Sequence, residues 1–508
     1  MLFDHMRSVK NGSLLAAIDL GSNSFRLEIC RYSHGLIQRI EYIKETVRQG
    51  SGLDEERNLS DEAMERGWDC LSRFAERLTG FRSTQVRAVA TQTLREANNR
   101  KVFLEKANRI LGFPIEVVSG REEARLIYQG VTRLLPPTQD RRLIIDIGGR
   151  STECVLGQGV QAKVLESYRL GSVSSSMKYF SNGELTAQAF QRAEVAAKAV
   201  MDEALAVIPR KSWDTALGSS GTVGAVAEAL ATAGWPAGVI TRKGLDWLKQ
   251  QLIDAGQLDK VRMEGLREDR KAVIGGGLSV LSAVMDLFEI DTLQVTPGAL
   301  RHGLLYDLIE REDENKDVRA ITVSGLQKTF SADGVQAQRV SRVACFFLEQ
   351  LKNTLDTEQN WSRYLKKLDW AAQLHEIGTQ ISHTDSHKHG AYILENTDTP
   401  GFAMHELQRL SLLVLGHKGK LRKLEIEHED AFFIYQLMSL RLAVILCHAR
   451  RDPEAEGMKF GLSSHVPRCF ELQLEPMWAV RFPQSNHLLH QEVASWQKTN
   501  WELRLLDR

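Results

Sequence analysis

The sequence has no long hydrophobic run and no excess of charge of either sign. No stretch approaches the roughly 18 uninterrupted apolar residues of a membrane-spanning helix, so no transmembrane segment is predicted. Residues 1–15 carry scattered charges and lack an apolar core, so they are not expected to be a signal peptide. Lysine plus arginine and aspartate plus glutamate both number 65. The overall charge therefore gives no indication of nucleic-acid binding, and an anionic ligand would have to meet local basic clusters.

Cysteine is also scarce, and its spacing excludes the common zinc motifs. The six cysteines include no C-x-x-C pair and mostly lie in apolar runs. This pattern predicts reduced, buried thiols in a cytoplasmic protein. Peripheral association with a membrane stays an open alternative. With 508 residues, the chain is too long for a single core, so two to four domains are expected.

The most informative stretch is residues 144–153, which read IIDIGGRSTE. Apolar residues lead into Asp146, two glycines follow, and a second apolar run begins after Glu153. The pattern predicts a strand, a tight turn and a second strand. Glycine lets a backbone approach a phosphate closely, and successive N–H groups in such a turn form an anion-binding concavity. A carboxylate beside the turn can bind Mg²⁺, which prefers oxygen ligands.

The same pattern occurs earlier, at residues 17–27, which read AIDLGSNSFRL. The two stretches match at three positions, which are Asp19 with Asp146, Gly21 with Gly148, and Ser24 with Ser151. One such turn alone is typical of an ordinary hairpin, whereas two matching copies indicate an internal repeat. We therefore expect two phosphate-binding hairpins that face each other across a cleft.

Strand and helix patterns alternate as far as about residue 310, which favours an α/β architecture. Residues 36–48 are expected to form a further strand pair. Ser119 or Gly120 is expected to begin a helix with Glu122 and Glu123 in its first turn. These two glutamates are about 100° apart on a helix, so at most one can point squarely into a cleft. Stabilisation of the helix end by their charge is the alternative role.

The charged segment 311–318 is the predicted boundary between the α/β half and a helical half. Strand patterns fade beyond it, and residues 467–508 regain short alternating runs that predict a small β-containing tail. Long helices with apolar faces are predicted at 335–355, 361–377, 403–417 and 429–450. The predicted domains are 11–138, 139–312, 313–466 and 467–508.

The paired hairpins and the segment between them resemble the exopolyphosphatase / guanosine pentaphosphate phosphohydrolase family. The motifs are DLGSNSFR, IDIGG-STE and SGREEARLIY, and the likeness continues through LDWAAQLHEIG and HGAYILENTDTPGF. It covers essentially the whole chain and is greatest to the long, exopolyphosphatase-type members. The resemblance implies two actin-like, Hsp70-like (RNase H-like) α/β domains around a cleft, then a mostly helical HD-like half with a small β tail.

The resemblance implies an exopolyphosphatase that releases terminal phosphate from inorganic polyphosphate. Release of phosphate from pppGpp, giving ppGpp, is the alternative or a second activity on one site. Glu123 would be the general base that activates water, and Arg95 would stabilise charge on the transferred phosphoryl group. Mg²⁺ would lie at Asp146 and Glu153, with Asp19 approaching it through water, and K⁺ is a candidate activator. The implied phosphate-binding residues are Ser22, Asn23, Arg26, Gly148, Gly149, Arg150 and Ser151.

The chain departs from the family pattern in two places. Arg150 stands where the family usually has a third glycine; it would add a phosphate contact, narrow the site, or point away as an exposed turn residue. In the HD-like half, Gln336, the pair His375-Glu376 and Val444 stand where HD phosphohydrolases have metal ligands. Because only one ligand type remains, no metal is expected there, and His375 is expected to be buried and hydrogen-bonded.

Basic residues cluster twice in the helical half. Such runs are usually solvated surface, but in a polyphosphate enzyme they could form a track with salt-dependent affinity for the chain. The track candidates are His383, His387, Lys388, His389, His417, Lys418 and Lys420, followed by Arg422 and Lys423. The resemblance also implies a homodimer.

Two other classes of function stay open. An ATP-driven kinase or actin-like ATPase would need a nucleoside pocket, which the turn GSSGT at 218–222 could provide at a helix N-terminus. A non-catalytic sensor would bind polyphosphate or pppGpp without hydrolysis, and the intact Glu123, Asp146 and Glu153 argue against it. The motifs do not separate polyphosphate from pppGpp, because both end in the same phosphoanhydride.

Overall fold

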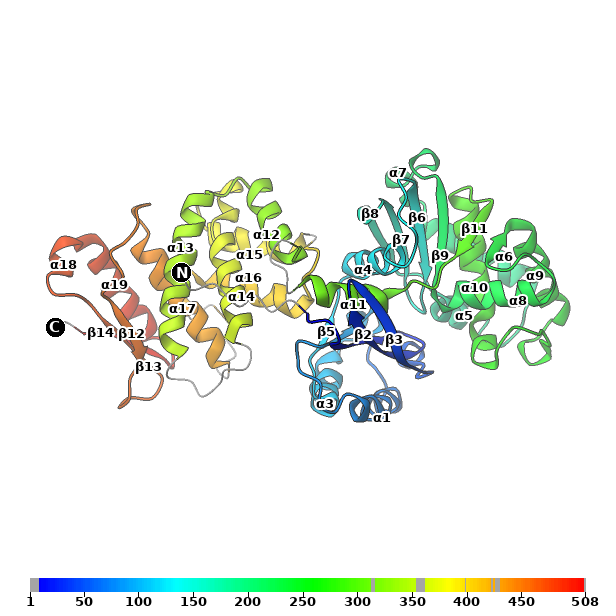
Figure 1. Ribbon diagram of the computed structural model, residues 1–508, viewed down its shortest axis with the longest axis horizontal. Coiled ribbons are helices and arrows are strands. Elements are labelled where there is room, and N and C mark those ends of the chain that lie inside the picture. The colour runs from blue at the N-terminus through cyan, green and yellow to red at the C-terminus, as the bar shows by residue number, and fades with distance from the viewer. Residues whose placement is uncertain are drawn as a thin grey trace. The chain divides into compact units, whose positions relative to one another are not determined.

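A computed structural model describes residues 9–311, 316–352, 361–397, 399–421, 424 and 430–506. The chain divides into two compact units, Met1–Asp317 and Val318–Arg508 (Figure 1). All six cysteines are free, and five of them are buried. Within the described residues, no helix is long and apolar enough to cross a membrane.

The first unit is built on two sheets that repeat one topology. Their strand orders are β3-β2-β1-β4-β5 and β10-β11-β9-β6-β7-β8. In each sheet a central antiparallel hairpin, β1–β2 or β6–β7, is extended by a third antiparallel strand on one side and by two parallel strands on the other, and the second sheet adds β10 antiparallel to β11. The internal repeat predicted from the two aspartate-glycine turns is therefore confirmed as a repeat of topology.

The strands have the following bounds. The first sheet contains β1 (Leu14–Leu20), β2 (Phe25–Ser33), β3 (Leu36–Glu45), β4 (Val86–Ala90) and β5 (Ile115–Val117). The second contains β6 (Arg141–Ile147), β7 (Thr152–Gln158), β8 (Gln161–Tyr168), β9 (Thr215–Ser219), β10 (Val239–Thr241) and β11 (Thr292–Val295).

The strand pair predicted at residues 36–48 is wrong. This stretch forms the single strand β3, which pairs with the preceding β2. The connection is a tight turn in which His34 and Gly35 have φ values of 51° and 85°. Because such a turn returns the chain directly along β2, the segment continues the meander instead of forming its own hairpin.

Helices cover both sheets of this unit and also separate them. Their bounds are α1 (Asp61–Arg77), α2 (Gln92–Glu96), α3 (Arg100–Leu111), α4 (Gly120–Thr132), α5 (Ser172–Tyr179), α6 (Ala187–Met201), α7 (Ala204–Val207), α8 (Ser220–Thr232), α9 (Arg242–Ala255), α10 (Glu268–Leu287) and α11 (Leu300–Glu310). A short 3₁₀ helix, η1, spans Gln49–Gly52.

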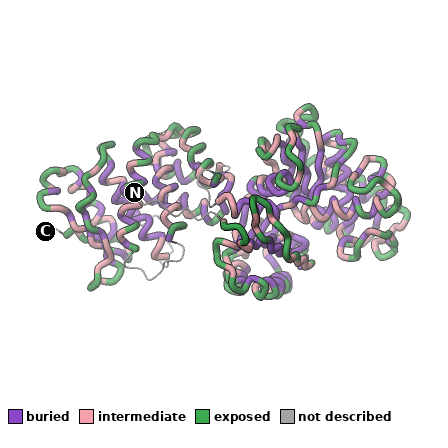
Figure 2. Tube along the Cα trace, in the orientation of Figure 1, coloured by how far each residue is buried: buried purple, intermediate pink, exposed green. Residues whose placement is uncertain are grey.

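The alternation of side chains along each strand explains the layers. Leu15 and Ala17 of β1 face a middle core with α4, α11 and the second sheet, whereas Ala16 and Ile18 face an outer core with α1 and α3. Successive strand residues point to opposite faces, and both faces are covered here, so β1 is apolar at nearly every position. Figure 2 shows the resulting buried strands at the centre of the unit. The predicted α/β half is confirmed.

Buried ion pairs hold α4 against α11. Arg125 of α4 donates to Glu122 at 2.7 Å and also contacts Asp307 of α11, which pairs in turn with Arg87 of β4. Burial alone would raise the pKa of Asp307, but Arg87, Arg125 and Arg311 hold it well below the ordinary value. This network fixes the helix that begins beside the cleft described below.

The second unit is mostly helical and ends in a three-stranded sheet of order β12-β13-β14. A single hydrophobic core joins its helices to that sheet. The helices are α12 (Val318–Thr329), α13 (Gly334–Leu351), α14 (Trp361–Leu374), α15 (Ser386–Asn396), α16 (Met404–Gly416), α17 (Ala431–Leu446), α18 (Trp478–Arg481) and α19 (Pro483–Trp496). The strands are β12 (Lys459–Leu462), β13 (Cys469–Gln473) and β14 (Glu502–Leu506).

The helical half and its β-containing tail are thus confirmed as a fold class. The four helices predicted from apolar periodicity correspond to α13, α14, α16 and α17, although residues 353–355 and 429 lie outside the described residues. The division into four domains is finer than the two units and stays a prediction.

Candidate active site

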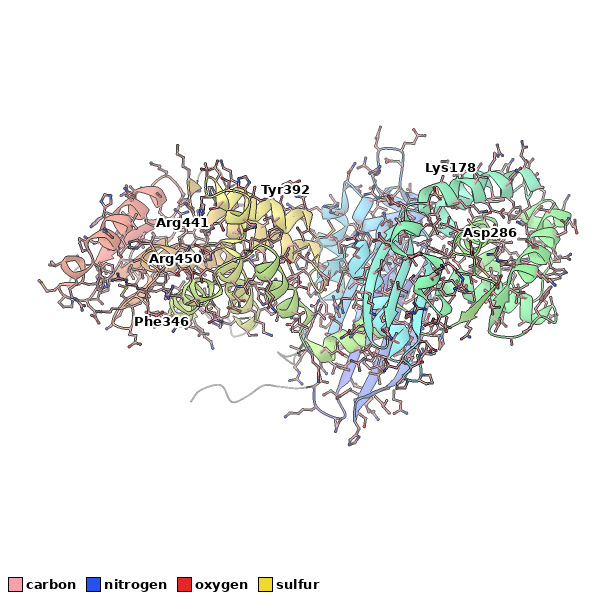
Figure 3. The ribbon with its side chains drawn as sticks, turned by 90° about the horizontal axis from the view of Figure 1, so that it is seen from above. Lys178, Asp286, Phe346, Tyr392, Arg441 and Arg450 are labelled. Atoms are coloured by element: carbon pink, nitrogen blue, oxygen red, sulfur yellow. The ribbon has the colours of Figure 1, made fainter. Side chains whose placement is uncertain are left out.

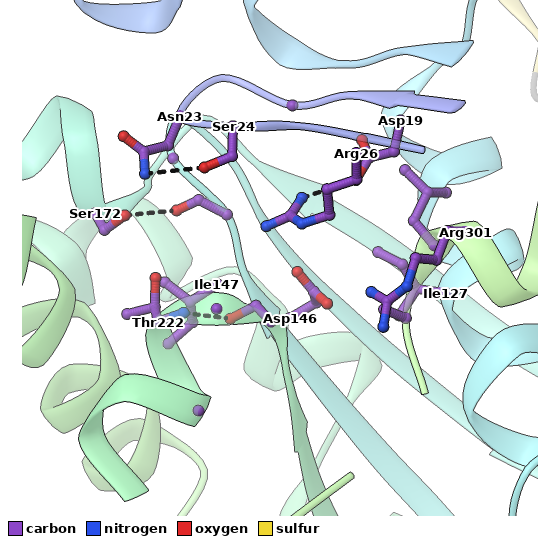
Figure 4. A pocket seen from close by; sticks show the side chains of 18 of the residues that line it. Asp19, Asn23, Ser24, Arg26, Ile127, Asp146, Ile147, Ser172, Thr222 and Arg301 are labelled. Atoms are coloured by element: carbon purple, nitrogen blue, oxygen red, sulfur yellow. Dashed lines mark hydrogen bonds and ion pairs between the residues drawn. The ribbon is translucent and has the colours of Figure 1, made fainter. Parts of the chain in front are cut away.

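A cavity of about 510 Å³ lies between the two sheets of the first unit. We call the part built on the β1–β5 sheet lobe I and the part built on the β6–β11 sheet lobe II. Both hairpin turns line the cavity, together with the first turns of α4, α8 and α11 (Figure 4). The cleft expected between two facing hairpins is therefore present. The turn residues that line it are Gly21, Ser22, Asn23 and Ser24 of lobe I, and Gly148, Gly149 and Ser151 of lobe II.

The two turns lie close together, and this contact explains why residue 149 is a glycine. A Cβ added to Gly149 would lie 2.9 Å from the Cβ of Ser22 in the opposite lobe and 3.2 Å from a methyl group of Val173. Gly149 does not have a positive φ, so the close contact, and not backbone conformation, requires glycine here. The lobe II turn is closed by the Gly148 N–H, which donates to the Ser151 carbonyl at 2.9 Å.

Three of the predicted acidic residues form a buried group. Burial raises the pKa of Glu123 to about 7, although Arg95 opposes the shift. Burial likewise raises the pKa of Asp146 to about 6, and it raises the pKa of Glu153 well above the ordinary value, with the charges of Glu123 and Asp146 adding to the effect. Oε1 of Glu153 accepts from Ser167 at 2.8 Å, but its buried Oε2 has no hydrogen-bond partner in the part of the chain that the structure describes.

This group fits a divalent cation. Within the described residues, no three histidine, cysteine, aspartate or glutamate side chains are arranged to hold a metal by themselves. Mg²⁺, however, is usually bound by one or two carboxylates together with phosphate oxygens and water. Like charges in a buried site and the unpartnered Oε2 of Glu153 are what such an ion would relieve. The role of Mg²⁺ stays a proposal.

The two neighbouring glutamates of α4 differ in position, as their spacing on a helix predicts. Ser119 caps the helix by accepting from the N–H of Glu122 at 3.1 Å. Glu123 lines the cavity, whereas Glu122 points to Arg125 and the buried ion pairs. Of the two, Glu123 is therefore the one that can reach a ligand in the cleft.

Arg95 lies against Glu123. Its Nη1 donates to Oε2 of Glu123 at 2.7 Å and to the Val118 carbonyl at 3.0 Å, and its Nε and Nη2 donate to Oε1 of Gln92. Among the described residues, the cavity lining includes Glu123 but not Arg95. In this arrangement Arg95 orients the carboxylate, and direct stabilisation of a phosphoryl group stays a prediction.

Arg150 does not lie where a phosphate ligand would. Its side chain crosses from lobe II to lobe I and donates to Glu96 and to the Gly50 carbonyl. The guanidinium is thus engaged by protein groups outside the cavity lining. The expectation that Arg150 points away as an exposed turn residue is also wrong, because its side chain is only 18 % exposed.

The lobe I hairpin contributes a charge pair to the cavity. Nη1 of Arg26 donates to Oδ2 of Asp19 at 2.8 Å, and both residues line the cavity. Arg26 also lowers the pKa of Asp146 in opposition to burial. Asp19 and Arg26 therefore lie on the same side of the cavity as Asp146 of β6, as Figure 4 shows.

The far part of the cavity, apart from the GSSGT turn, is lined by residues that no motif of the sequence predicted. There the lining includes Tyr42, Lys44, Ser220, Gly221, Thr222, Arg267, Arg270 and Arg301. Arg270 is 5 % exposed and its Nε has no hydrogen-bond partner among the described residues. Ser220 begins α8 with a φ of 96°, a strained value for a residue with a side chain. Of these signals, only the GSSGT turn was visible in the sequence, because the arginines come from separate helices.

The predicted polyphosphate-track residues differ in exposure, and three of them line a second cavity. His417 is buried, and its Nδ1 donates to the Val414 carbonyl at 2.6 Å, so it is not part of an exposed basic face. His383, Lys388 and Lys420 are exposed, whereas His387 and His389 are half-buried. Lys418 is exposed as well. His383, His417 and Lys418 line a second cavity, and Arg422 and Lys423 lie outside the described residues.

That second cavity, of about 710 Å³, lies in the helical unit. Gln336, His375, Glu376 and Val444 all line it, so the positions aligned with HD metal ligands do meet in space. His375 is buried and its Nδ1 donates to the Ala372 carbonyl at 2.6 Å, which confirms the expectation for this residue.

Two family models match this chain, one over the first unit and one over the second. Residues 28–312 match the model of the Ppx/GppA phosphatase family, and residues 318–496 match Ppx/GppA phosphatase, domain III. A protein of Vibrio atlanticus (strain LGP32) named guanosine-5'-triphosphate,3'-diphosphate pyrophosphatase is 39% identical over 97% of this chain and 98% of its own length. The protein of the same name from Vibrio vulnificus (strain YJ016) is 37% identical over 99% of this chain and 100% of its own.

Solved structures resemble the first unit. An exopolyphosphatase-like protein aligns with a TM-score of 0.54 and 26% identity, over 59% of this chain and 98% of its own. An exopolyphosphatase from Cytophaga hutchinsonii ATCC 33406 aligns with a TM-score of 0.53 and 22% identity, over 58% of this chain and 98% of its own, which supports the fold alone. The predicted actin-like domains around a cleft are thereby confirmed. The chain belongs to the Ppx/GppA phosphatase family and is a hydrolase.

Proposed function

We propose that this chain hydrolyses the terminal phosphoanhydride bond of guanosine 5'-triphosphate 3'-diphosphate (pppGpp), giving ppGpp and orthophosphate, with Mg²⁺ as cofactor. The observation that carries the proposal is that Glu123, both anion-binding turns and the buried Arg270 line one cavity. The names of the full-length Vibrio relatives support pppGpp as the substrate.

In the proposed reaction the two turns bind the phosphate and Glu123 activates the attacking water. Backbone N–H groups and the hydroxyls of Ser22 and Ser151 would hold the terminal phosphate. A water oxygen attacks the terminal phosphorus, the bond to the bridging oxygen breaks, and the bridging oxygen leaves with ppGpp. Glu123 accepts the proton from that water. Phosphoryl transfer has a loose transition state, so positioning and charge neutralisation carry most of the catalysis.

The surrounding charges suit this reaction. Asp146, together with Asp19 and Glu153, would hold Mg²⁺, which when bound would neutralise negative charge on the phosphate oxygens. Arg26 adds a cation on the lobe I side of the cavity. With a cation present, the pKa values of Glu123 and Asp146 fall, which leaves Glu123 ionised and able to accept a proton near neutral pH.

The far part of the cavity would bind the 3'-diphosphate. Arg267 and Arg270 precede or begin α10, and a Cβ added to Gly221 at the start of α8 would lie only 2.2 Å from Nη2 of Arg270. The N-terminus of α8 and the Arg270 guanidinium therefore border the same space. Both favour anions, and the Nε of Arg270, which lies 3.8 Å from Oδ2 of Asp269, makes no hydrogen bond within the described part of the chain.

The test is phosphate release by purified protein with Mg²⁺, comparing pppGpp with long-chain polyphosphate at matched concentrations of terminal phosphate. We expect a larger kcat/KM with pppGpp. A clear preference for polyphosphate would contradict the choice of substrate but leave the hydrolytic site intact. Release from neither substrate would contradict both.

Exopolyphosphatase activity is the second candidate function, because a polyphosphate chain ends in the same phosphoanhydride. The exposed Lys388 and Lys420 of the helical unit favour it, since they could hold a polyanion. The variant with both lysines changed to glutamate should lose polyphosphate hydrolysis and keep pppGpp hydrolysis. Equal loss with both substrates would contradict a track. Homodimer formation and activation by K⁺ belong to this proposal as well.

A further inference from the structure

Arg150 connects the lobe II phosphate turn to lobe I. Its Nε and Nη2 donate to Oε2 of Glu96 at 3.1 and 2.9 Å, and its Nη1 donates to the Gly50 carbonyl at 2.9 Å. The side chains of Arg150 and Glu96 are 18 % and 10 % exposed, so water screens this ion pair little. The contact is possible only while the two turns lie close together, as the approach of Gly149 to Ser22 shows.

The contact continues from Glu96 toward the cleft. Oε1 of Glu96 accepts from Nε2 of Gln92 at 2.7 Å. Oε1 of Gln92 in turn accepts from Nε and Nη2 of Arg95 at 2.9 and 2.6 Å. Residues 92, 95 and 96 share one face of the short helix α2, because positions three and four apart are neighbours on a helix.

The last link reaches the general base of the proposed reaction. Nη1 of Arg95 donates to Oε2 of Glu123 at 2.7 Å. A planar guanidinium held at Nε, Nη1 and Nη2 has no rotational freedom left, so the direction of its bond to Glu123 is fixed by Gln92 and the Val118 carbonyl. An unbroken path of side-chain hydrogen bonds thus runs from Arg150 through Glu96, Gln92 and Arg95 to Glu123.

We propose that Arg150 is a positioning residue for Glu123, acting through Glu96, Gln92 and Arg95. The inference rests on the proposed function, in which Glu123 activates water. A third glycine at position 150 could not make this connection. In the structure the lobe II turn lies against lobe I, so the contact of Arg150 with Glu96 and the direction of the Glu123 carboxylate belong to the same arrangement of the two turns.

The first test is the Arg150→Met variant of the full chain. Because the substrate contacts are unchanged, kcat should fall about ten- to hundredfold with little change in KM. The matched control is Arg141→Met in lobe II, since Nε and Nη2 of Arg141 contact Asp214 and its Nη1 contacts the Lys211 carbonyl. That variant loses the same kinds of contact, two hydrogen bonds to a carboxylate and one to a backbone carbonyl, but away from the cavity. It should therefore keep the wild-type kcat. A kcat for Arg150→Met within about twofold of the control would overturn the proposal.

A double-mutant cycle separates positioning from general stabilisation. If Arg150 acts through Glu96, then Arg150→Met combined with Glu96→Gln should be no slower than the slower single variant, and Arg150→Lys should recover part of kcat. Rate losses that multiply, or a rise in KM at constant kcat, would show that Arg150 serves lobe stability or substrate binding instead.

A crystal structure of Arg150→Met gives a readout that does not depend on turnover. The proposal predicts that the Arg95–Glu123 contact is lost or displaced, whereas an unchanged contact would overturn it. If the wild-type chain releases no phosphate from pppGpp or polyphosphate, the proposed function fails, and this structural comparison still decides whether Arg150 positions Glu123.

Discussion

Asp146 and Glu153 are direct cross-strand partners on β6 and β7, at the position where Asp19 and Arg26 are partners on β1 and β2. The first hairpin thus pairs opposite charges, and the second pairs two carboxylates. Like charges directly opposite each other destabilise a sheet, more so where both are buried. In lobe I the cross-strand partner Arg26 balances the charge of Asp19, whereas in lobe II the cross-strand partner of Asp146 is a second carboxyl group, which is consistent with the proposed Mg²⁺.

This relationship predicts how pH affects the metal-free protein. Carboxyl groups whose pKa is raised on folding contribute stability below their unfolded pKa of about 4, and that contribution is lost as the pH rises through the folded value. The folded values are about 6 for Asp146 and about 7 for Glu123. Between pH 5 and 8 the free energy of unfolding should therefore fall more in the wild-type chain than in Glu153→Gln, which lacks one of the carboxyl groups whose pKa is raised on folding.

Chemical unfolding of metal-stripped protein at both pH values measures this difference. The lowered pKa values of Glu28 and Asp307 act below about pH 4, outside the range compared. Buried histidines contribute equally to both proteins and cancel. Added Mg²⁺ should raise the melting temperature more at pH 8 than at pH 5. A shift that is the same at both pH values, or that survives in Asp146→Asn, would contradict binding at this carboxylate group.

Glu123 and Glu122 give a test with adjacent residues. Glu123→Gln should lower kcat by roughly 10²–10⁴-fold with little change in KM, because the amide cannot accept the proton from water. Glu122→Gln should lower the melting temperature instead, since it removes a buried charge partner of Arg125. Steady-state phosphate release and thermal unfolding of both variants check the assignment. The reverse pattern would exchange the two roles.

Arg270 should distinguish substrates that differ only at the 3' position. Arg270→Ala should raise KM for pppGpp about tenfold or more, and it should leave hydrolysis of GTP, which lacks the 3'-diphosphate, nearly unchanged. Each substrate serves as the control for the other, because the reacting end is identical. An equal effect on both would place Arg270 in general support of the cleft.

The helical unit contains a buried ion pair, and the stability lost when one partner is removed can be measured. Nη2 of Arg441 in α17 donates to Oε2 of Glu492 in α19 at 2.7 Å, and the side chains are 6 % and 5 % exposed. Figure 3 labels Arg441 and Arg450 in this unit. Glu492→Gln should lower the free energy of unfolding by about 3–5 kcal/mol, because a buried charge loses its partner. Arg450→Ala removes ion pairs with Asp333 and Glu376 from a half-exposed guanidinium and should cost at most about 1 kcal/mol for each pair.

The sequence was sufficient to predict the elements that follow from local chemistry. The two turns could be found because Asp19 and Asp146 each lie near the end of a buried strand, two residues before a glycine. The helix angle predicted that at most one of Glu122 and Glu123 would face the cleft, and the family resemblance pointed to Glu123. The path from Arg150 to Glu123 could not be found. It joins residues 150, 96, 92, 95 and 123, whose order along the chain says nothing about which lobe surfaces meet.

The same limit explains the other differences. His417 lies in a run of basic residues, yet it is buried, and its ring packs against the rings of His375 and His387. Arg270 and Arg301 come to one cavity from α10 and α11, and neither belongs to a local motif. Periodicity reports which face of a helix is apolar, but not which partner covers it.

The most direct test of the account is single-turnover release of orthophosphate from pppGpp, labelled at the terminal phosphate, by wild-type protein and by Glu123→Gln with Mg²⁺. The account predicts that the variant binds pppGpp with an affinity close to that of the wild type and releases phosphate at least about a hundredfold more slowly. Equal rates for the two proteins would contradict the central claim that Glu123 activates the attacking water.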